Sequence, residues 1–367
     1  MTMRKIIFLI TDLDLGGSPL VVRRLACGLA ASGTWQPTVV SLATPGVVGR
    51  WIRRDGVPVV GLHARGPRDG AVLRRWLGVL QAVQPDVVMS VLIHANVIAA
   101  LGSGFGPQCR YFQSIHTLAE HPAWHWHAQS VIAGQCAAVI APSRFILQRI
   151  AGYGGVPPGV VIPNGIDVEC FAKALPIAPT LRPWPADALV VGYVGRFDPV
   201  KRLPLLLQAA AALIHADEVG WRYLHVALVG YGRQEAYLRN LAAELGIAAR
   251  VHFTGITSTP QHWYKAMDVL CMPSLSEGFG LNMVEAMAAG TPVLAFDTPA
   301  VREIVTHCRT GWLVDPARTS ALAQGLIALL KDHSFRGELG AMAAEEAAQR
   351  FSAVQMVEQY QKIFGQT

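Results

Sequence analysis

The sequence has little charge and no apolar run long enough to cross a bilayer. Only 15% of its 367 residues are charged. The longest apolar candidate, residues 87–101, carries Ser90, His94 and Asn96 and is shorter than a membrane-spanning helix. Residues 1–14 pass from two basic side chains into one short apolar segment without a cleavage-like region. We therefore expect neither a membrane span nor a secretory leader, and we predict a cytoplasmic protein.

Paired cysteines and dinucleotide-binding glycines are also missing. The six cysteines are scattered without the spacing of a metal or redox motif, which indicates free thiols in a reducing compartment. No Gly-x-Gly-x-x-Gly sequence opens the first strand-to-helix turn, and this disfavours a dinucleotide oxidoreductase. No short repeat period is present.

Apolar residues make up 52% of the chain, punctuated by 35 glycines and 23 prolines. Such short apolar runs are typical of buried parallel strands that alternate with helices, and the length predicts two domains. We place the domains at 1–170 and 188–350, joined by a Pro-rich linker at 171–187, with a final helix at 351–367. The first helix is expected to begin at Pro19 with Ser18 as its cap.

Predicted strands can be bounded in both halves of the chain. In the first half they cover 5–10, 37–42, 57–62, 86–92, 109–115 and 137–141, and the segment 160–167 closes that domain. In the second half they cover 189–196, 224–229, 251–253, 269–272, 293–296 and 311–314. Long helical patterns follow at 320–331, 334–351 and 353–364. The fold class is therefore α/β, with two doubly wound domains.

The net charge of +6 is confined to the first half of the chain. Residues 1–180 hold 15 Lys and Arg against 8 Asp and Glu, while residues 181–367 hold 16 against 17. Arginines cluster around Trp51 and Trp76, a mixture that favours an anionic membrane surface. The alternative is an ordinary helix whose apolar stripe includes Trp76 and whose arginines are solvated. No nucleic-acid motif accompanies the charge.

The most informative segment runs from Ser276 to Val293. It places Glu277 at the carboxyl end of a predicted strand and Glu285 about one turn into the helix that follows, which stops at Gly290. Ligands bind at this edge of an open α/β sheet, and amides at a helix start bind anionic or hydroxyl-rich groups. Spacing alone also allows a solvated helix residue and a turn residue.

This segment resembles the Glu-x7-Glu motif of the retaining glycosyltransferases of family 4. The match covers both acids, the intervening residues Gly278, Phe279, Gly280 and Leu281, and the tail that ends at Val293. The resemblance implies the GT-B fold, in which two Rossmann-like domains face each other across a cleft. It also implies that Glu277 faces the donor sugar and that Glu285 holds the ribose hydroxyls of the nucleotide.

A second motif supplies positive charge. Gly195 and Arg196 end the first strand of the second domain, and Lys201 follows five residues later. A guanidinium and an ammonium can together neutralise a diphosphate. The pair resembles the Gly-Arg-x4-Lys motif of the same family, which implies donor-diphosphate binding that requires no divalent metal and no other cofactor.

The remaining candidates rest on position. His116 follows a predicted strand where the family often has a histidine facing the donor sugar. Gly16 and Gly17 resemble the glycine pair of the family's first loop, although Ser-Pro-Leu follows here in place of Ala-Glu-Arg. Gly230 lies in a segment that resembles part of the base pocket.

Two further patterns suggest metal binding. Asp12 and Asp14 have the Asp-x-Asp spacing of metal-dependent glycosyltransferases, but we interpret them as loop polarity because they follow the first strand. His121, His125 and His127 offer three zinc ligands without a completing carboxylate or cysteine. A sugar-stacking acceptor loop and a helix with inward tryptophans remain alternatives there.

The sequence thus predicts a metal-independent, retaining glycosyltransferase. Its donor is a nucleotide diphosphate sugar, with UDP-sugars favoured and GDP-sugars possible. Its acceptor is a hydroxyl, of a lipid-linked or cell-surface glycan precursor, and peripheral association with the inner face of a membrane is expected from the basic first domain. A GT-B epimerase or phosphorylase and a non-catalytic sugar-nucleotide sensor are the alternatives. No nucleic-acid partner is expected.

Overall fold

The computed structural model divides the chain into two compact units. The first comprises residues 1–166 together with 353–367, and the second comprises 167–352. Residues 3–66, 69–116, 124–153, 159–216, 220–318 and 320–365 are described. The side chain of Trp124 and all of His121 lie outside that description, so the predicted acceptor or zinc segment at 121–127 is only partly covered.

The first unit is built on a sheet of seven parallel strands in the order β3-β2-β1-β4-β5-β6-β7. The strands are β1 (Arg4–Ile10), β2 (Trp35–Ser41), β3 (Val59–Gly61), β4 (Val87–Val91), β5 (Arg110–Ser114), β6 (Ala138–Ala141) and β7 (Gly159–Val161). The helices are α1 (Gly17–Ala31), α2 (Val47–Arg54), α3 (Ala71–Val83), α4 (Ile93–Ser103), α5 (Trp124–Ala133), α6 (Arg144–Ala151) and α15 (Ala353–Gly365).

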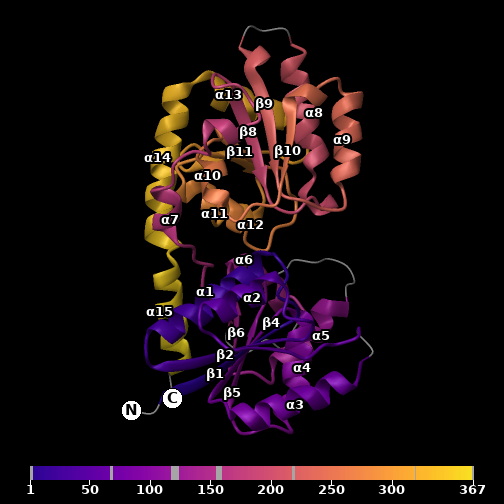
Figure 1. Cartoon of the computed structure of the whole chain (residues 1–367), viewed down its shortest axis with the longest axis vertical. Helices are drawn as coiled ribbons and strands as arrows, with labels where there is room; N and C mark the ends of the chain where they lie inside the picture. Colours follow the sequence, from indigo (N-terminus) through magenta and orange to yellow (C-terminus); the bar gives the residue numbers. More distant parts are fainter. Residues whose placement is uncertain are drawn as a thin grey trace. The chain divides into compact units, whose positions relative to one another are not determined.

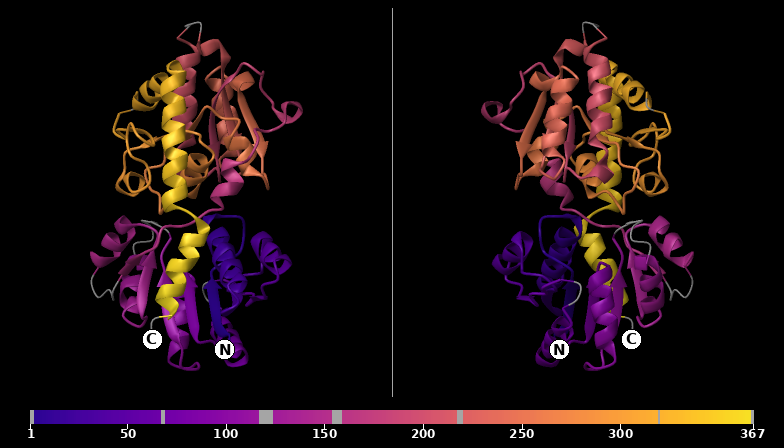
Figure 2. Two further views of the ribbon diagram at one scale, coloured as in Figure 1. Left: turned by 90° about the vertical axis from the view of Figure 1, so that its left-hand side faces the viewer. Right: turned by 90° about the vertical axis from the view of Figure 1, so that its right-hand side faces the viewer.

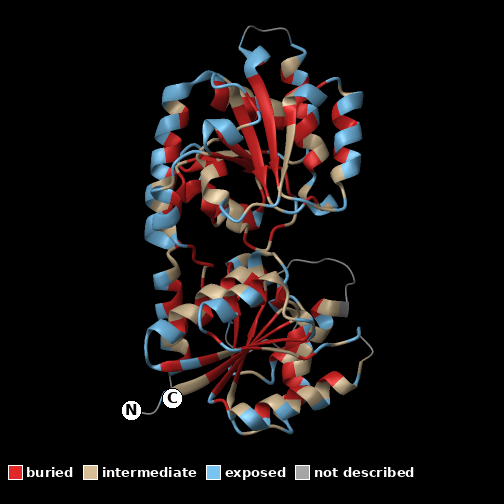
Figure 3. Cartoon of the chain, viewed as in Figure 1, coloured by how far each residue is buried: buried red, intermediate tan, exposed pale blue. Residues whose placement is uncertain are grey.

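Helices cover both faces of this sheet. α1 packs against α2 and α15, whereas α4 packs against α3 and α5 (Figure 1). Right-handed crossovers produce this division, because the chain leaves β1 toward β3 in one direction and passes from β4 toward β7 in the other. The strands are buried along most of their length, as the red strands of Figure 3 show, which explains their near-continuous apolar sequences.

The second unit contains a sheet of six parallel strands in the order β10-β9-β8-β11-β12-β13. The strands are β8 (Leu189–Val194), β9 (Leu224–Val229), β10 (Val251–Gly255), β11 (Val269–Met272), β12 (Val293–Phe296) and β13 (Gly311–Val314). The helices are α7 (Val168–Ala172), α8 (Leu203–Ile214), α9 (Glu235–Glu244), α10 (Pro260–Tyr264), α11 (Leu281–Ala288), α12 (Pro299–Arg302), α13 (Ala321–Lys331) and α14 (His333–Arg350).

The helices of the second unit also form two layers. α8 packs against α9 and α13, and α11 packs against α7, α10 and α14. α14 runs along one side of this unit in Figure 1, and that side, with the helix drawn in yellow, faces the viewer in the left view of Figure 2. The two doubly wound α/β sheets predicted from the sequence are therefore confirmed.

The start of the first helix differs from the prediction. α1 begins at Gly17 with Gly16 as its cap, and no side chain caps it. Ser18 lies inside the helix instead of before it. The sequence places the glycine pair in the loop before the helix, whereas Gly17 is already the first residue of the helix.

The segment predicted as a linker, 171–187, packs onto the second unit. The ring of Phe171 lies 6.0 Å from that of Tyr264, and Trp184 lies 6.0 Å from Trp263. The amide of Ile177 donates to the carbonyl of His262 at 2.9 Å. The division between units falls after Ile166, before the predicted linker begins.

The tryptophans of the basic half have different surroundings. Trp76 in α3 is fully buried in a core cluster with Leu80, so the core-stripe alternative describes this helix. Trp51 in α2 is partly exposed, and the guanidinium of Arg23 lies 5.7 Å from its ring centre. Across the described ranges, no helix combines the length and the apolar character that a membrane span needs.

Candidate functional site

The predicted site residues of the second unit gather where its strand order reverses. β8 lies between β9 and β11, so the connections that follow β8 and β11 lead away in opposite directions. Ligands of open α/β sheets bind at such a switch point, beyond the carboxyl ends of the strands. Gly195 and Arg196 directly follow β8, and the segment that contains Glu277 follows β11. The two motifs are therefore neighbours, although 76 residues separate Lys201 from Glu277.

An ion pair joins the two motifs. The Nζ atom of Lys201 donates to Oε1 of Glu277 at 2.6 Å, and the side chains are 19% and 7% exposed. Lys201 ends a 3-10 turn at Pro199–Lys201 that Asp198 caps through the amide of Val200. A carboxylate as buried as that of Glu277 requires such a partner, because removing a lone charge from water costs several kcal/mol, to an order of magnitude.

Arg196 differs from Lys201 in its surroundings. Its side chain is exposed, and within the described part of the chain its guanidinium makes no hydrogen bond or ion pair. Its backbone is fixed instead, since the hydroxyl of the fully buried Tyr193 donates to its carbonyl at 3.2 Å. The site therefore offers an unpaired guanidinium beside an ammonium that already holds a carboxylate.

Two loops of the site approach each other through their backbones. Gly195 has a φ of +145° and Gly230, which follows β9, has a φ of +138°. A Cβ atom at Gly230 would lie 1.9 Å from the carbonyl oxygen of Gly195. Only glycine fits there, so the contribution predicted for Gly230 is one of backbone and space.

The helix α11 starts beside these loops. Gly280 caps it in the left-handed conformation, with a φ of +84°, and Gly290 follows it at +75°. The side chain of Asn282 donates to the carbonyl of Val194 at 3.0 Å and so ties the first turn of α11 to the end of β8. Asn282 lies within the motif segment but was not singled out from the sequence, because its partner depends on the order of the strands.

Glu285 lies in the second turn of α11 and is 9% exposed. Its Oε2 atom accepts a hydrogen bond of 3.0 Å from the hydroxyl of Tyr264, the last residue of α10. Sequence reasoning missed Tyr264, since nothing in the pattern of α10 marks it. Phe279 is buried and packs its ring against Phe351 at 5.8 Å, so any contact it makes with a donor is limited to its backbone.

The other predicted site residues belong to the first unit. Gly16 and Gly17 follow β1, which lies beside β4 at the reversal of that sheet. His116 follows β5, and its Nε2 atom lies 2.8 Å from the hydroxyl of Ser114. Loss of water around the ring lowers the pKa of His116 to about 4, so the imidazole is neutral at physiological pH.

The two patterns that suggested metal binding have local contacts. The amide of Asp14 donates to the carboxylate of Asp12 at 3.2 Å, as a polar loop does. The ring of His125 packs edge-on against His94, and that of His127 against Tyr153. The stacking of Trp126 on Tyr153 and its burial describe inward packing of this tryptophan.

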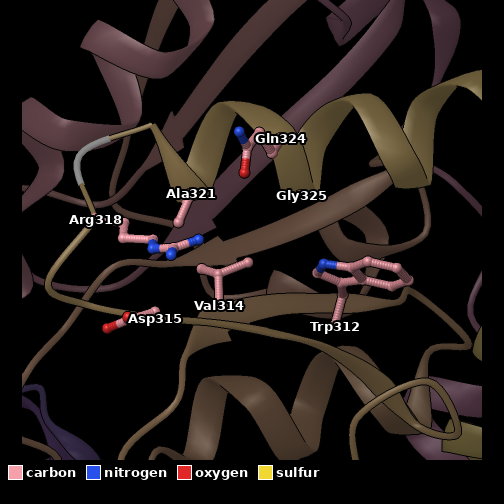
Figure 4. Close-up of a pocket in the computed structure, with 7 residues that line it drawn as sticks. All are labelled: Trp312, Val314, Asp315, Arg318, Ala321, Gln324 and Gly325. Atoms are coloured by element: carbon pink, nitrogen blue, oxygen red, sulfur yellow. The ribbon is translucent and has the colours of Figure 1, made fainter.

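A pocket of about 200 Å³ in the second unit lies elsewhere. It is formed between β13 and α13, and Figure 4 shows Trp312 and Arg318 on either side of Val314. None of the residues lining it belongs to the predicted site. Its position on the edge strand separates it from the β8–β11 switch point.

Comparison with known proteins supports the resemblance found in the sequence. The family model for glycosyltransferase family 4 matches residues 15–170, and that for glycosyl transferases group 1 matches residues 182–350. A D-inositol 3-phosphate glycosyltransferase of Frankia alni is 36% identical over 60% of this chain and 56% of that protein. A phosphatidyl-myo-inositol mannosyltransferase of Mycobacterium leprae is 31% identical over 65% of this chain and 60% of that protein. The chain thus spans somewhat more than half the length of these relatives.

Solved structures share the fold over nearly the whole chain. HepE of Anabaena in complex with UDP-glucose has a TM-score of 0.85 at 23% identity, over 98% of this chain and 99% of that one. Sucrose-phosphate synthase from Thermosynechococcus elongatus has a TM-score of 0.82 at 24% identity, over 99% of this chain and 100% of that one. At these identities the likeness is one of fold.

Proposed function

The chain belongs to the family 4 glycosyltransferases of the GT-B fold, and from this premise we propose that it transfers a sugar from a nucleotide diphosphate sugar to a hydroxyl acceptor. We favour a UDP-sugar as donor, with a GDP-sugar as the alternative. The observation that carries the proposal is the ion pair between Lys201 and Glu277 at the β8–β11 switch point, where Arg196 follows the end of β8.

In this proposal Arg196 and Lys201 bind the diphosphate of the donor. The guanidinium can contact two phosphate oxygens at once, and the ammonium adds a compact charge. Both stabilise the negative charge that grows on the diphosphate as it leaves, which is where preorganised electrostatics are most effective. Two cations at this place make a divalent metal unnecessary, so we propose metal-independent chemistry.

The sugar is transferred with retention of its anomeric configuration. The bond between the anomeric carbon and the phosphate oxygen breaks, and a bond to the acceptor oxygen forms on the same face of the sugar. The departing phosphate oxygen takes the acceptor proton, so no protein base is required. Glu277, held by Lys201, and the neutral His116 are assigned to orienting the sugar, and Glu285 is assigned to the ribose.

A thermal-shift screen over UDP-, GDP- and ADP-sugars tests donor binding. A ligand at about 100 times its Kd stabilises the fold by about 2.7 kcal/mol, which is readily measured. We expect one nucleotide class to raise the melting temperature and Arg196→Ala to abolish that rise. Arg309→Ala is the matched control. Arg309 is exposed and precedes β13, so it lies at the amino end of its strand, whereas Arg196 follows the carboxyl end of β8. An undiminished shift in Arg196→Ala would remove the diphosphate assignment.

The reaction itself separates the alternatives. Incubation with the sugar nucleotide alone converts it if the protein is an epimerase, and inorganic phosphate added to a glycan releases a sugar phosphate and the shortened glycan if it is a phosphorylase. We expect neither. Nuclear magnetic resonance of the product should show the anomeric configuration of the donor, and excess EDTA should leave the rate unchanged.

The acceptor is proposed to be anionic or lipid-linked, as in the synthesis of a cell-surface glycan. The excess of basic residues in the first half of the chain supports this, and the two relatives described above are named for D-inositol 3-phosphate and phosphatidyl-myo-inositol. Screening inositol phosphates and polyprenyl-phosphate glycans against the identified donor would test it.

Peripheral attachment to the inner face of a membrane is proposed through α2. Arg53 donates to the carbonyl of Val59 at 2.8 Å, whereas Arg50 and Arg54 are exposed and make no ion pair within the described ranges. Each basic residue near an anionic surface contributes about 1 kcal/mol. We expect sedimentation with phosphatidylglycerol vesicles but not with phosphatidylcholine vesicles, and its loss in Arg50→Glu/Arg54→Glu. Binding that survives this double change would refute the assignment to α2.

A further inference from the structure

Tyr264 brings a buried hydroxyl to the carboxylate of Glu285. The tyrosine side chain is fully buried, and the glutamate is 9% exposed, so their 3.0 Å hydrogen bond is almost entirely shielded from water. Burial, and then the nearby charge of Glu285, raise the pKa of Tyr264 well above its ordinary value. The hydroxyl therefore keeps its proton and acts as a donor throughout the neutral pH range.

The backbone carbonyl of Tyr264 is also held in place, close to α11, the helix that carries Glu285. Its carbonyl oxygen accepts hydrogen bonds from the hydroxyl of Thr291 at 2.7 Å and from the amide of Met267 at 3.0 Å. Thr291 is the third residue beyond the end of α11, while Glu285 lies within α11. One residue of α10 thus contacts α11 at its middle and beyond its end, and the ring of Phe171 packs beside it.

A glutamate needs such support to bind a pair of adjacent hydroxyls well. The final torsion of its side chain is broad, so an unsupported carboxylate samples many planes. A binding group whose orientation is fixed by surrounding hydrogen bonds does not lose that freedom when the ligand arrives. The Tyr264 hydroxyl acts on Oε2 of Glu285 and restricts this rotation.

We propose that Tyr264 is a positioning residue that orients Glu285 to receive the 2′ and 3′ hydroxyls of the donor ribose. This rests on the proposed function, in which Glu285 contacts the ribose. Tyr264 does not touch the nucleotide in this proposal and acts through Glu285. Its removal should consequently weaken the recognition of the ribose hydroxyls and leave the rest of the nucleotide site intact.

The test compares UDP with 2′,3′-dideoxy-UDP, and GDP with 2′,3′-dideoxy-GDP, by calorimetry on the full chain. The native protein should bind the ribonucleotide more tightly. Tyr264→Phe should weaken its binding about five- to tenfold, the worth of one hydrogen bond, and leave the dideoxynucleotide unchanged. An equal loss for both ligands would mean a general structural role and would overturn the proposal, as would an unchanged preference.

Tyr193→Phe is the matched control, because it removes another fully buried hydroxyl from the same unit. That hydroxyl donates to the carbonyl of Arg196, so its loss should alter both ligands equally and spare the ribose preference. If Tyr264→Phe does not fold, 3-fluorotyrosine at position 264 keeps the side chain and changes its strength as a donor. The ribose preference should then shift, and a constant preference would refute the proposal.

Glu285→Gln distinguishes failure of this inference from failure of the proposed function. The variant should lose the ribose preference, and adding Tyr264→Phe to it should have no further effect. If Glu285→Gln keeps the native preference, the ribose role of Glu285 itself is wrong. If Glu285→Gln loses the preference and Tyr264→Phe retains it, the ribose role of Glu285 survives and the positioning role of Tyr264 is refuted.

Discussion

The ion pair between Lys201 and Glu277 allows a test that separates its contribution to the stability of the protein from its contribution to donor binding. Lys201→Met keeps the length and apolar stem of the side chain and removes its charge. Glu277 is then left 7% exposed without its cation. Breaking a buried pair in this way costs about 3–5 kcal/mol when both partners are fully buried. Since Lys201 is 19% exposed, we expect unfolding free energy to fall by about 2–3 kcal/mol.

The structure supplies a control for the geometry of the pair. Lys173 and Glu169 also lie 2.6 Å apart, but their side chains are 75% and 79% exposed. Water already stabilises both charges there, so Lys173→Met should leave the unfolding transition unchanged. The distance is the same in the two pairs, whereas their burial differs.

A second substitution tests the cause of the loss. Glu277→Gln in the Lys201→Met background removes the uncompensated charge and should recover most of the lost stability, measured by urea unfolding followed by circular dichroism. The double variant should still bind the donor nucleotide weakly, because the ammonium is absent. The reasoning fails if Lys201→Met is as stable as the native protein, or if Glu277→Gln recovers nothing.

Three further substitutions test the loops and the interior of the second unit. Gly230→Ala should lower the unfolding free energy by at least about 3 kcal/mol, because its Cβ would overlap the carbonyl of Gly195, and a near-native urea midpoint would contradict this. Gly280→Ala, at a φ of +84°, should cost a milder 1–2 kcal/mol or so, and a loss as large as that at Gly230 would refute this ordering. Burial lowers the pKa of His225 from 6.5 to about 4, and that of the neighbouring His252 is lowered too, so the unfolded chain takes up protons first as acid is added. The free energy of unfolding should be highest above about pH 6.5 and fall as the pH is lowered toward 4. His225→Gln should reduce that fall by about 1–3 kcal/mol in urea unfolding. An identical fall in the variant would exclude this histidine as its source.

Much of the second unit could be predicted because its strands are short apolar runs with clear ends in the sequence. The predicted ranges 224–229, 269–272, 293–296 and 311–314 coincide with β9, β11, β12 and β13. Each is a short, mostly apolar run. β9, β11 and β12 are buried along their whole length, and the edge strand β13 is buried at its two end residues, which is the pattern expected of strands in a covered parallel sheet. The start of α1 was harder, because Ser18 before Pro19 is an effective cap signal and a glycine pair gives no competing one.

Contacts between distant segments could not be predicted in the same way. The proline-rich stretch before β8 has the composition of a linker, yet Trp184 and Phe171 find aromatic partners on the second unit. Likewise, spacing put Glu277 and Arg196 at strand ends, but the contact of Lys201 with Glu277 needs β8 beside β11. The order of the strands is a property of the folded sheet, and it cannot be predicted from the residue spacing within either motif.

The two cations of the site should contribute unequally to donor binding. Lys201 must share its ammonium between Glu277 and an incoming diphosphate, so part of its attraction to phosphate is offset by a weakened ion pair. Arg196 is exposed and has no acid to release within the described residues, so its guanidinium gives its full interaction to the ligand. We therefore expect Arg196→Ala to weaken nucleotide binding more than removal of both charges of the pair in Lys201→Met/Glu277→Gln, by about tenfold or 1.4 kcal/mol, in calorimetry at equal salt. In the Glu277→Gln background the order should reverse, so that Lys201→Met weakens binding more than Arg196→Ala. There Lys201 is released from its ion pair and gains affinity for phosphate. If each substitution causes the same loss of nucleotide affinity with and without Glu277→Gln, the ion pair has no influence on how the diphosphate is held.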